Sequence, residues 1–317
     1  PRIRPTPGRG AGPPRAPRPP PRPAPHPADP LTFLVSVEAG TIGPVIVAFL
    51  SFVLAAASAP GEAAPMAERI EAVSAAFLGA PYERSPLGEG EGIDPDARYR
   101  EDAFDCLTLV ETAIALAHSR DRRKAERILD EIRYASGRAP SLQSRLHLME
   151  AQWIPDLIRK GYLEEVTPQY GGEEVIWIEV ELDERRWARR RLLPALRWEP
   201  ELEGAHRLPV VPLQVAQRIA HTFPAGLVID VVREALGEDL TRITHTGLIV
   251  EREGKRYVRH AALRERRVID EPLEGFLARH AWMRKRRVTG IHLSAIRDNQ
   301  DRVASLLCDD AGSESLA

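Results

Sequence analysis

The sequence predicts an α+β protein in which helices come first and an antiparallel sheet follows. Apolar residues between positions 66 and 163 recur at helical spacing, as in MAERIEAVSAAFLGAPY. Segments between positions 174 and 270 are instead short, rich in β-branched residues and partly alternating, which is typical of strands. A set of helices followed by a set of strands indicates the α+β class.

The first half of the pattern contains the expected helices. A loop rich in glycine, proline and aspartate separates the first helix from the second, and Gly161 is the expected stop of the last. We expect these helices over Met66–Tyr82, Phe104–His118 and Arg123–Tyr134, and within residues 141–163.

The second half contains the expected strands. Two of them, ITHTGLIVE and KRYVRHAAL, flank Arg252–Gly254, a loop of hairpin length with a glycine. We expect strands over residues 174–182, 226–234, 243–251, 255–263 and 266–270.

The N-terminal region has a different character. Residues 1–30 hold thirteen of the 28 prolines, a composition that cannot bury a core, so we expect this segment to be disordered. Residues 31–63 contain the apolar run VIVAFLSFVLAAASA, which predicts a signal peptide or a membrane anchor. The protein is therefore expected to be exported, to the periplasm or cell envelope, and to meet a membrane only through this segment. We expect one domain over residues 64–300 and a flexible tail over 301–317.

Charge and cysteine content argue against two classes of protein. The chain has 44 basic and 46 acidic residues, and its basic excess lies in the segment that cannot fold, so we expect no nucleic-acid partner. The two cysteines are Cys106 and Cys308, and the second lies in the polar tail, so we expect no disulfide framework.

One of these cysteines lies at the start of an apolar helix. Asp105 is placed to cap that helix, and the unpaired N–H groups at a helix N-terminus lower the pKa of a thiol at Cys106. A lone cysteine is more often a small core residue, so this helix alone does not establish catalysis.

A catalytic thiol needs a base, and histidine is the usual one near neutral pH. His245 and His260 lie on the two arms of the expected hairpin, where they can share one face and one can hold the tautomer of the other. A metal site at these histidines is the weaker alternative, because no H-E-x-x-H or C-x-x-C spacing accompanies them, and we expect no metal or cofactor. His147 is left open, and the remaining histidines are expected to be solvated or in the core: His26, His118, His206, His221, His280 and His292.

Several segments, in order, carry a resemblance to a known family. The chain resembles the NlpC superfamily of papain-like cysteine hydrolases, which cut bacterial cell-wall peptides. The resemblance lies in an Asp-Cys pair on a helix, a strand that contains HTG, and a following strand that contains another histidine. Within it, FDCLTLVETAIALA, DEIRYASG, SRLHLMEAQWI, ITHTGLIVE and RHAAL resemble the N-acetylmuramoyl-L-alanine amidase-like family, over about Phe77 to Leu293. This resemblance implies a papain-like, NlpC-type fold, in which N-terminal helices carry the nucleophile and pack on an antiparallel sheet that carries the histidines.

The resemblance also implies a role for individual residues. Cys106 is the nucleophile, His245 the general base and then acid, and His260 the residue that orients it. Asp105 matches the acidic residue that precedes the nucleophile in the family, and its implied role is structural rather than catalytic. Other residues match positions beside the oxyanion site or along the substrate groove of relatives: Tyr82, Arg145, His147 and Trp153.

The implied activity is hydrolysis, through an acyl-enzyme, of the amide between N-acetylmuramic acid and L-alanine in peptidoglycan or muropeptides. Arginines suit peptide carboxylates, and Arg133, Arg145 and Arg185 are candidates. Leu148 and Ala262 depart from the family pattern, which bears on substrate preference more than on the reaction. Three alternatives stay open: an endopeptidase that cuts inside the stem peptide, a non-catalytic cell-wall binding module, and a membrane-tethered structural protein.

Overall fold

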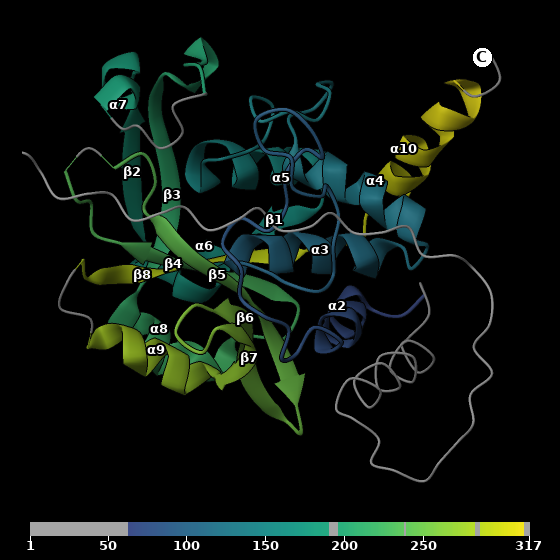
Figure 1. The fold of residues 1–317 in the computed structure, drawn as a ribbon. Coiled ribbons are helices and arrows are strands. Elements are labelled where there is room, and N and C mark those ends of the chain that lie inside the picture. The colour runs from purple at the N-terminus through teal and green to yellow at the C-terminus, as the bar shows by residue number, and fades with distance from the viewer. Residues whose placement is uncertain (1–62, 190–195, 238, 283–285, 314–317) are drawn as a thin grey trace, which may run out of the picture. The chain divides into compact units, whose positions relative to one another are not determined.

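The computed structural model describes residues 63–189, 196–237, 239–282 and 286–313 (Figure 1). The segment expected to be disordered, over residues 1–30, and the apolar run of the expected signal or anchor lie outside the described residues. Among the described helices, none has the length and apolar character needed to cross a membrane.

The expected helices are confirmed, with shifts at their ends. The first ends earlier than expected, at Ala75, and the last begins with a π-helical turn and ends at Gly161, which has the left-handed φ of 84° of a helix stop. The helices are α2 (Met66–Ala75), α3 (Cys106–His118), α4 (Arg122–Arg133), α5 (Ile154–Lys160), α6 (Thr167–Gly171), α7 (Glu184–Arg189), α8 (Leu213–Ile219), α9 (Leu273–Ala281) and α10 (Gln300–Ser313). Single turns are η1 (Met149–Trp153), η2 (Gly172–Glu174), η3 (Pro200–Leu202) and η4 (Ala220–Thr222).

The strands of the described chain form one eight-stranded antiparallel sheet. Its order is β2-β3-β8-β4-β5-β6-β7, and the short β1 also pairs with β8. The α+β class and the antiparallel sheet are therefore confirmed. The strands are β1 (Leu163–Glu165), β2 (Ile176–Leu182), β3 (Gly204–Pro212), β4 (Leu227–Arg233), β5 (Ile243–Arg252), β6 (Lys255–Ala262), β7 (Arg267–Pro272) and β8 (Val288–Ile296).

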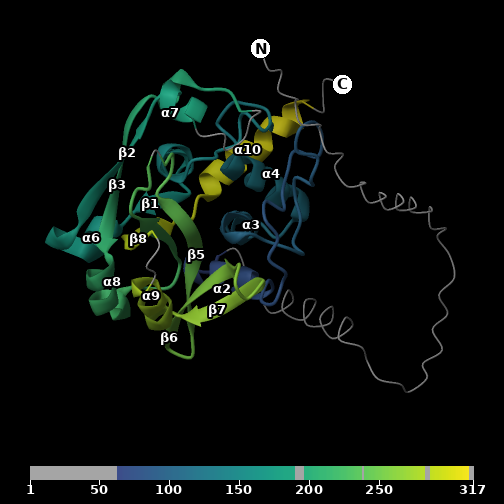
Figure 2. The same ribbon diagram turned by 60° about the vertical axis from the view of Figure 1, so that its left-hand side comes forward.

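Different helices cover the two faces of the sheet (Figure 1 and Figure 2). On one face, Ile114 of α3 belongs to a core cluster with Val228 of β4 and Leu248 of β5. On the other face, Phe276 of α9 belongs to a second cluster with Ile229 of β4. Successive strand residues point to opposite faces, so β4 supplies both clusters and is buried along its whole length.

The segment expected to be a flexible tail is instead mostly helical. Gln300–Ser313 forms α10, and Val303, Leu306 and Leu307 pack against the core cluster that contains α3. Three apolar side chains at helical spacing are enough to hold this otherwise polar helix on the domain. The domain therefore extends beyond the expected boundary at residue 300.

Candidate active site

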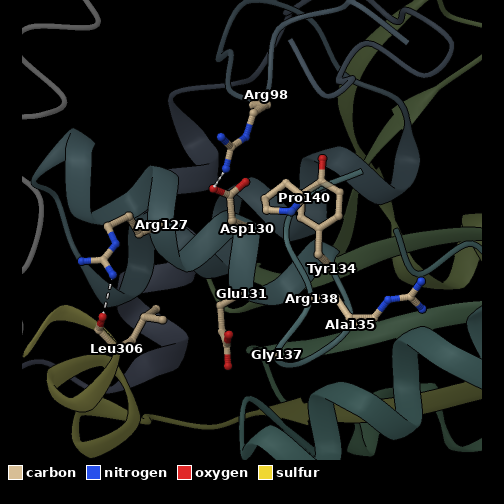
Figure 3. Close-up of a pocket in the computed structure, with 10 residues that line it drawn as sticks. All are labelled: Arg98, Arg127, Asp130, Glu131, Tyr134, Ala135, Gly137, Arg138, Pro140 and Leu306. Atoms are coloured by element: carbon tan, nitrogen blue, oxygen red, sulfur yellow. Dashed lines mark hydrogen bonds and ion pairs between the residues drawn. The ribbon is translucent and has the colours of Figure 1, made fainter. Parts of the chain in front are cut away.

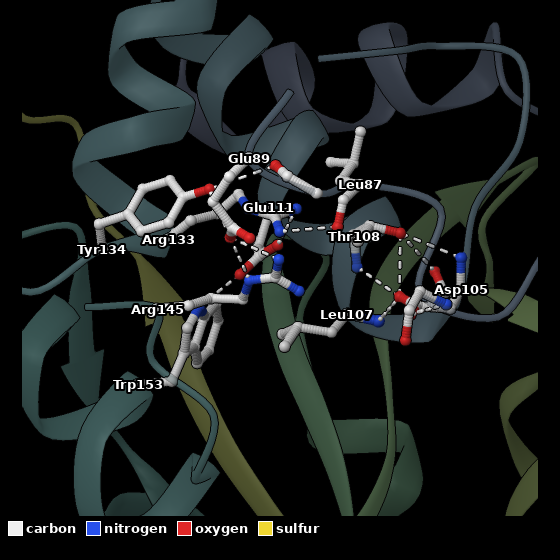
Figure 4. A network of polar contacts seen from close by, with 12 residues as sticks. Leu87, Glu89, Asp105, Leu107, Thr108, Glu111, Arg133, Tyr134, Arg145 and Trp153 are labelled. Carbon is white, nitrogen blue, oxygen red and sulfur yellow. Dashed lines mark hydrogen bonds and ion pairs between the residues drawn. The ribbon is translucent and has the colours of Figure 1, made fainter. Parts of the chain in front are cut away.

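Cys106 is the first residue of α3, and the turn that carries it is held by a reciprocal cap (Figure 4). Asp105 Oδ1 accepts hydrogen bonds from the backbone N–H groups of Leu107 and Thr108, at 3.1 and 2.8 Å. The Thr108 hydroxyl accepts one from the Asp105 N–H at 3.0 Å. A cap of this kind fixes the first helical turn. The prediction that Asp105 caps the helix is therefore confirmed.

Strands β5 and β6 bring two imidazoles together on one face of the sheet. His245 Nε2 and His260 Nδ1 lie 2.8 Å apart, and the two rings meet edge to face. Gly247 allows this close approach, because a Cβ there would lie 2.9 Å from Val258 Cγ1 and 3.1 Å from His260 Cβ. Phe276 of α9 packs against both rings, with centroid distances of 6.2 and 5.4 Å.

A carboxylate lies behind this pair of histidines. His260 is buried, and its Nε2 lies 3.3 Å from Glu271 Oε2 on β7. Arg279 of α9 holds both oxygens of Glu271, with its Nε 3.0 Å from Oε1 and an Nη 2.8 Å from Oε2. Burial by itself raises the pKa of Glu271, but the bonds from His260 and Arg279 outweigh it and lower the pKa to about 2. No spacing in the sequence pointed to Glu271 or Arg279.

One pocket contains the thiol and both rings. Side chains from α3, β5, β6 and α9 line it, among them Cys106, His245, His260 and His280. The backbone N–H groups of Cys106, Leu107 and Thr246 are placed to hydrogen bond to the sulfur. Thus Cys106, His245 and His260, to which the sequence gives the roles of nucleophile, base and orienting residue, all line one pocket.

The resting site combines a neutral thiol with a neutral imidazole. Burial, and then the charge on Asp105, raise the pKa of the half-buried Cys106 thiol to about 12. Because these effects outweigh the N–H groups of the helix start, the expected lowering of the pKa of this thiol is wrong for the resting site. Burial, and then the nearby ring of His260, hold the pKa of His245 well below 6.5. A thiol in this state is a nucleophile only after a base has removed its proton.

Tyr82 lines the same pocket. The backbone around it is fixed by a bridge to Phe104, two residues before Cys106, and by a hydrogen bond from Tyr82 N to Arg266 O at 2.9 Å. Burial, and then a charge on Cys106, raise the pKa of the phenol, so that its hydroxyl stays protonated and is able to donate a hydrogen bond.

Trp153 is a core residue, contrary to the expectation that it lies along a substrate groove. Its side chain is 0% exposed, and its Nε1 donates to Glu111 Oε1 at 3.0 Å (Figure 4). Glu111 is also buried and lies 3.5 Å from a guanidinium nitrogen of Arg133. Burial raises the pKa of Glu111 to about 7 although the charge of Arg133 opposes it. Trp153 and Arg133 thus stabilise a polar network in the interior and do not line the Cys106 pocket.

Arg145 and His147 also lie away from the pocket. Arg145 pairs with Glu89, at 2.8 Å from its Nε, and with Asp94, at 2.7 Å from an Nη (Figure 4). His147 Nε2 lies 2.7 Å from Leu142 O. The contacts of Arg145 tie the loop before α3 to the loop after α4. Both residues are expected along a substrate groove, and neither lines the pocket that contains Cys106.

Two other histidines have surroundings that the sequence did not indicate. His292 is 0% exposed at the centre of the sheet, in contact with Asp230 and Glu165, so of the two expected roles the core role is confirmed. His280 is buried in the wall of the pocket, and neither ring nitrogen hydrogen bonds to a described residue. Burial, and then the charge of Arg279, lower the pKa of His280 to about 3.

A second hollow lies between α4 and α10 (Figure 3). Its charged groups are already engaged: Arg98 pairs with Asp130, and Arg127 donates to Leu306 O at 2.7 Å. Its described lining residues include no cysteine and no histidine. The pocket at Cys106 is therefore the better candidate active site.

Comparison with known proteins assigns the chain to a family. The family model described as N-acetylmuramoyl-L-alanine amidase-like matches residues 72–283. The chain belongs to the N-acetylmuramoyl-L-alanine amidase-like family. The matched range includes Tyr82, Cys106, His245, His260 and Glu271. Membership indicates a hydrolase with a peptidoglycan-type substrate.

Solved structures share the fold at low sequence identity. A Legionella pneumophila protein is 21% identical with a TM-score of 0.67, over 78% of this chain and 93% of that chain. An N-acetylmuramoyl-L-alanine amidase from Bacteroides uniformis is 21% identical with a TM-score of 0.56, over 73% and 99%. A Bacteroides fragilis protein described as a xylanase candidate is 24% identical with a TM-score of 0.57, over 71% and 100%. At these identities the likeness shows the fold alone. No curated protein matches the sequence.

Proposed function

We propose that the protein is a cysteine amidase that cleaves the amide between the lactyl group of N-acetylmuramic acid and L-alanine. Its substrate is peptidoglycan or a muropeptide, and the reaction passes through an acyl-enzyme. The observation that carries this proposal is the meeting of Cys106, His245 and His260 at one pocket, in a chain of the amidase-like family.

The assignment of His245 as the base follows from its contacts. Its Nε2 is engaged by His260, so its Nδ1 is the nitrogen left to accept the thiol proton. As that proton moves, the Cys106 sulfur attacks the carbonyl carbon, and the Cys106 N–H and the Tyr82 hydroxyl stabilise the oxyanion. The imidazolium of His245 then protonates the departing amine of L-alanine. Water, activated by the same ring, releases the acyl group and restores the thiol.

The surroundings of the pocket support a substrate that carries carboxylates. Arg233 and Arg264 line it together with Arg279, whose charge Glu271 already balances, and Glu265 is the one acidic residue among the described lining residues, so the wall keeps an excess of positive charge. Peptide stems of cell-wall fragments are anionic, and arginine forks suit carboxylates. Arg233 and Arg264 take the place of the earlier candidates, because Arg133 and Arg145 pair with carboxylates elsewhere and Arg185 is exposed on α7 away from the pocket.

We also make two further proposals. The first is that the site is of the papain-like, NlpC type. The second is that the protein is exported to the periplasm or cell envelope. The first proposal is supported by a cysteine at the start of a buried helix that packs, in one core cluster, on the strand carrying the base. The second is supported by the apolar run before residue 60 and by the location of a cell-wall substrate.

The products identify the bond that is cut. Purified muropeptides are incubated with the parent protein, with the Cys106→Ala variant as background, and the products are read by mass spectrometry. Release of an intact stem peptide with a free L-alanine amine supports the proposal. Cleavage inside the stem would assign an endopeptidase, and binding without turnover by the parent would assign a binding module.

A further inference from the structure

We propose that Glu271 is a positioning residue of the Cys106 site: its carboxylate, clamped by Arg279, decides which nitrogens of His260 and His245 carry protons. This inference rests on the proposed function, because it assigns a role within the same site. Glu271 itself does not line the pocket and acts through His260.

The contacts form a continuous line that leads from Arg279 to the base. Arg279 holds both carboxylate oxygens of Glu271, at 3.0 and 2.8 Å. Glu271 Oε2 lies 3.3 Å from His260 Nε2, close enough for an ion pair, and this buried nitrogen makes no well-aligned hydrogen bond to any described residue. His260 Nδ1 then lies 2.8 Å from His245 Nε2. Each ring in this line contacts Phe276, which limits its rotation.

The negative charge decides the order of the protons. A carboxylate beside His260 Nε2 favours a proton on that nitrogen. A neutral imidazole has one N–H, so His260 Nδ1 is then an acceptor and His245 Nε2 must be the donor to it. That leaves a lone pair on His245 Nδ1, which is able to receive the Cys106 proton. The opposite order would leave His245 Nδ1 protonated and the site without a base.

Glu271 keeps its charge over the working pH range, as its pKa of about 2 requires. Besides His260, the charged or titratable groups with the largest effect on the His245 ring are Arg233, Arg279 and His280. The other such groups that line the pocket are Tyr82, Cys106, Arg264 and Glu265. Of the three with the largest effect, Arg233 and Arg279 carry a positive charge, and His280 is neutral because its pKa is about 3. The cations disfavour a positive charge on the histidine pair, whereas the carboxylate of Glu271 favours it. Removal of this carboxylate should therefore make the protonated form of the pair less stable.

The test compares Glu271→Gln with a matched control, Glu274→Gln, an exposed glutamate three residues further on. At pH 7.5, Glu271→Gln should lower kcat/KM on muropeptides by about 10-fold or more, since general acid–base catalysis contributes about 10²–10⁴-fold in total. The acid limb of its pH–rate profile should move to lower pH, because the carboxylate that stabilises the protonated pair is gone. Glu271→Asp should restore part of the activity, and the control should match the parent.

A second measurement is independent of turnover. Nitrogen-15 NMR of the histidine rings in the resting protein should show Nε2–H at His260 in the parent and a changed tautomer population in Glu271→Gln. An acid limb and tautomers equal to those of the parent would overturn the proposal even if kcat/KM fell. If Glu271→Gln does not fold, Arg279→Gln replaces it, with the same shift in tautomers expected and unchanged tautomers as the contrary result. If the parent cleaves no muropeptide, the proposed function fails, while the NMR result still decides the role of Glu271.

Discussion

The buried ion cluster at the centre of the sheet makes the stability of the fold depend on pH. His292 Nδ1 lies 3.0 Å from Asp230 Oδ2, and its Nε2 lies 2.7 Å from Glu165 Oε2. Burial alone lowers the pKa of His292, but the bonds to Asp230 and then to Glu165 outweigh it and raise the pKa to about 9.

The size and direction of the effect follow from this pKa. The ordinary value is 6.5, and the folded value lies above it. The contribution to the free energy of unfolding is therefore complete below pH 6.5 and is lost as the pH rises through about 9. One pKa unit corresponds to about 1.4 kcal/mol, so the full contribution is about 3 kcal/mol.

The assay is urea denaturation of the parent and of the Asp230→Asn/His292→Gln double variant between pH 6 and 9. The double variant removes the two fully buried charges together and leaves only Glu165, which is partly exposed to water. Subtracting its free energy of unfolding from that of the parent cancels the other titrating groups, and the difference should fall by about 3 kcal/mol from pH 6 to pH 9. The exposed His221, changed to Gln, is the control and should give a constant difference. A parent–variant difference that stays constant or grows would refute the reasoning.

Three further changes probe the elements around the site. Gly247→Ala should lower kcat/KM by about 10- to 100-fold, because a Cβ only 2.9 Å from Val258 Cγ1 displaces the strands that carry the histidines; activity equal to that of the parent would contradict this. Asp105→Ala should lower the free energy of unfolding by about 1 kcal/mol through loss of the cap, as measured in urea; an unchanged midpoint and slope would show that the cap does not stabilise the fold. Trp153→Phe should lower the free energy of unfolding by about 1–3 kcal/mol, because Glu111 loses a hydrogen-bond donor, and should leave KM unchanged. A higher KM at unchanged stability would indicate instead that Trp153 contacts the substrate.

Elements with local signals could be predicted from the sequence. Helix α3 has an acidic cap and a long apolar run, and β5 and β6 are joined by a short turn with Gly254. Strand β8 has no such signal, because it is buried on both faces and does not alternate. Its one strongly polar residue, His292, is compensated by partners on β1 and β4 that lie far away in the sequence.

Residue type predicts which side chains are able to act as nucleophile and base. It does not predict which side chains are buried or how burial changes their pKa. A cysteine at a helix start and two histidines on a hairpin suggest a nucleophile and a base wherever they meet. The type of a residue does not say that Trp153 points into the core or that burial raises the pKa of the Cys106 thiol. Glu271 acts only through a contact between neighbouring strands, so no spacing along the chain indicates it.

The activity of two cysteine variants on muropeptides tests the central claim most directly. Cys106 lines the pocket with both histidines, whereas Cys308 is a free, exposed thiol on α10 and serves as the matched control. Cys106→Ala should lower kcat/KM by about 10³-fold or more, to the background rate, while Cys308→Ala keeps the activity of the parent. A folded Cys106→Ala protein that cleaves muropeptides as fast as the parent would contradict the account.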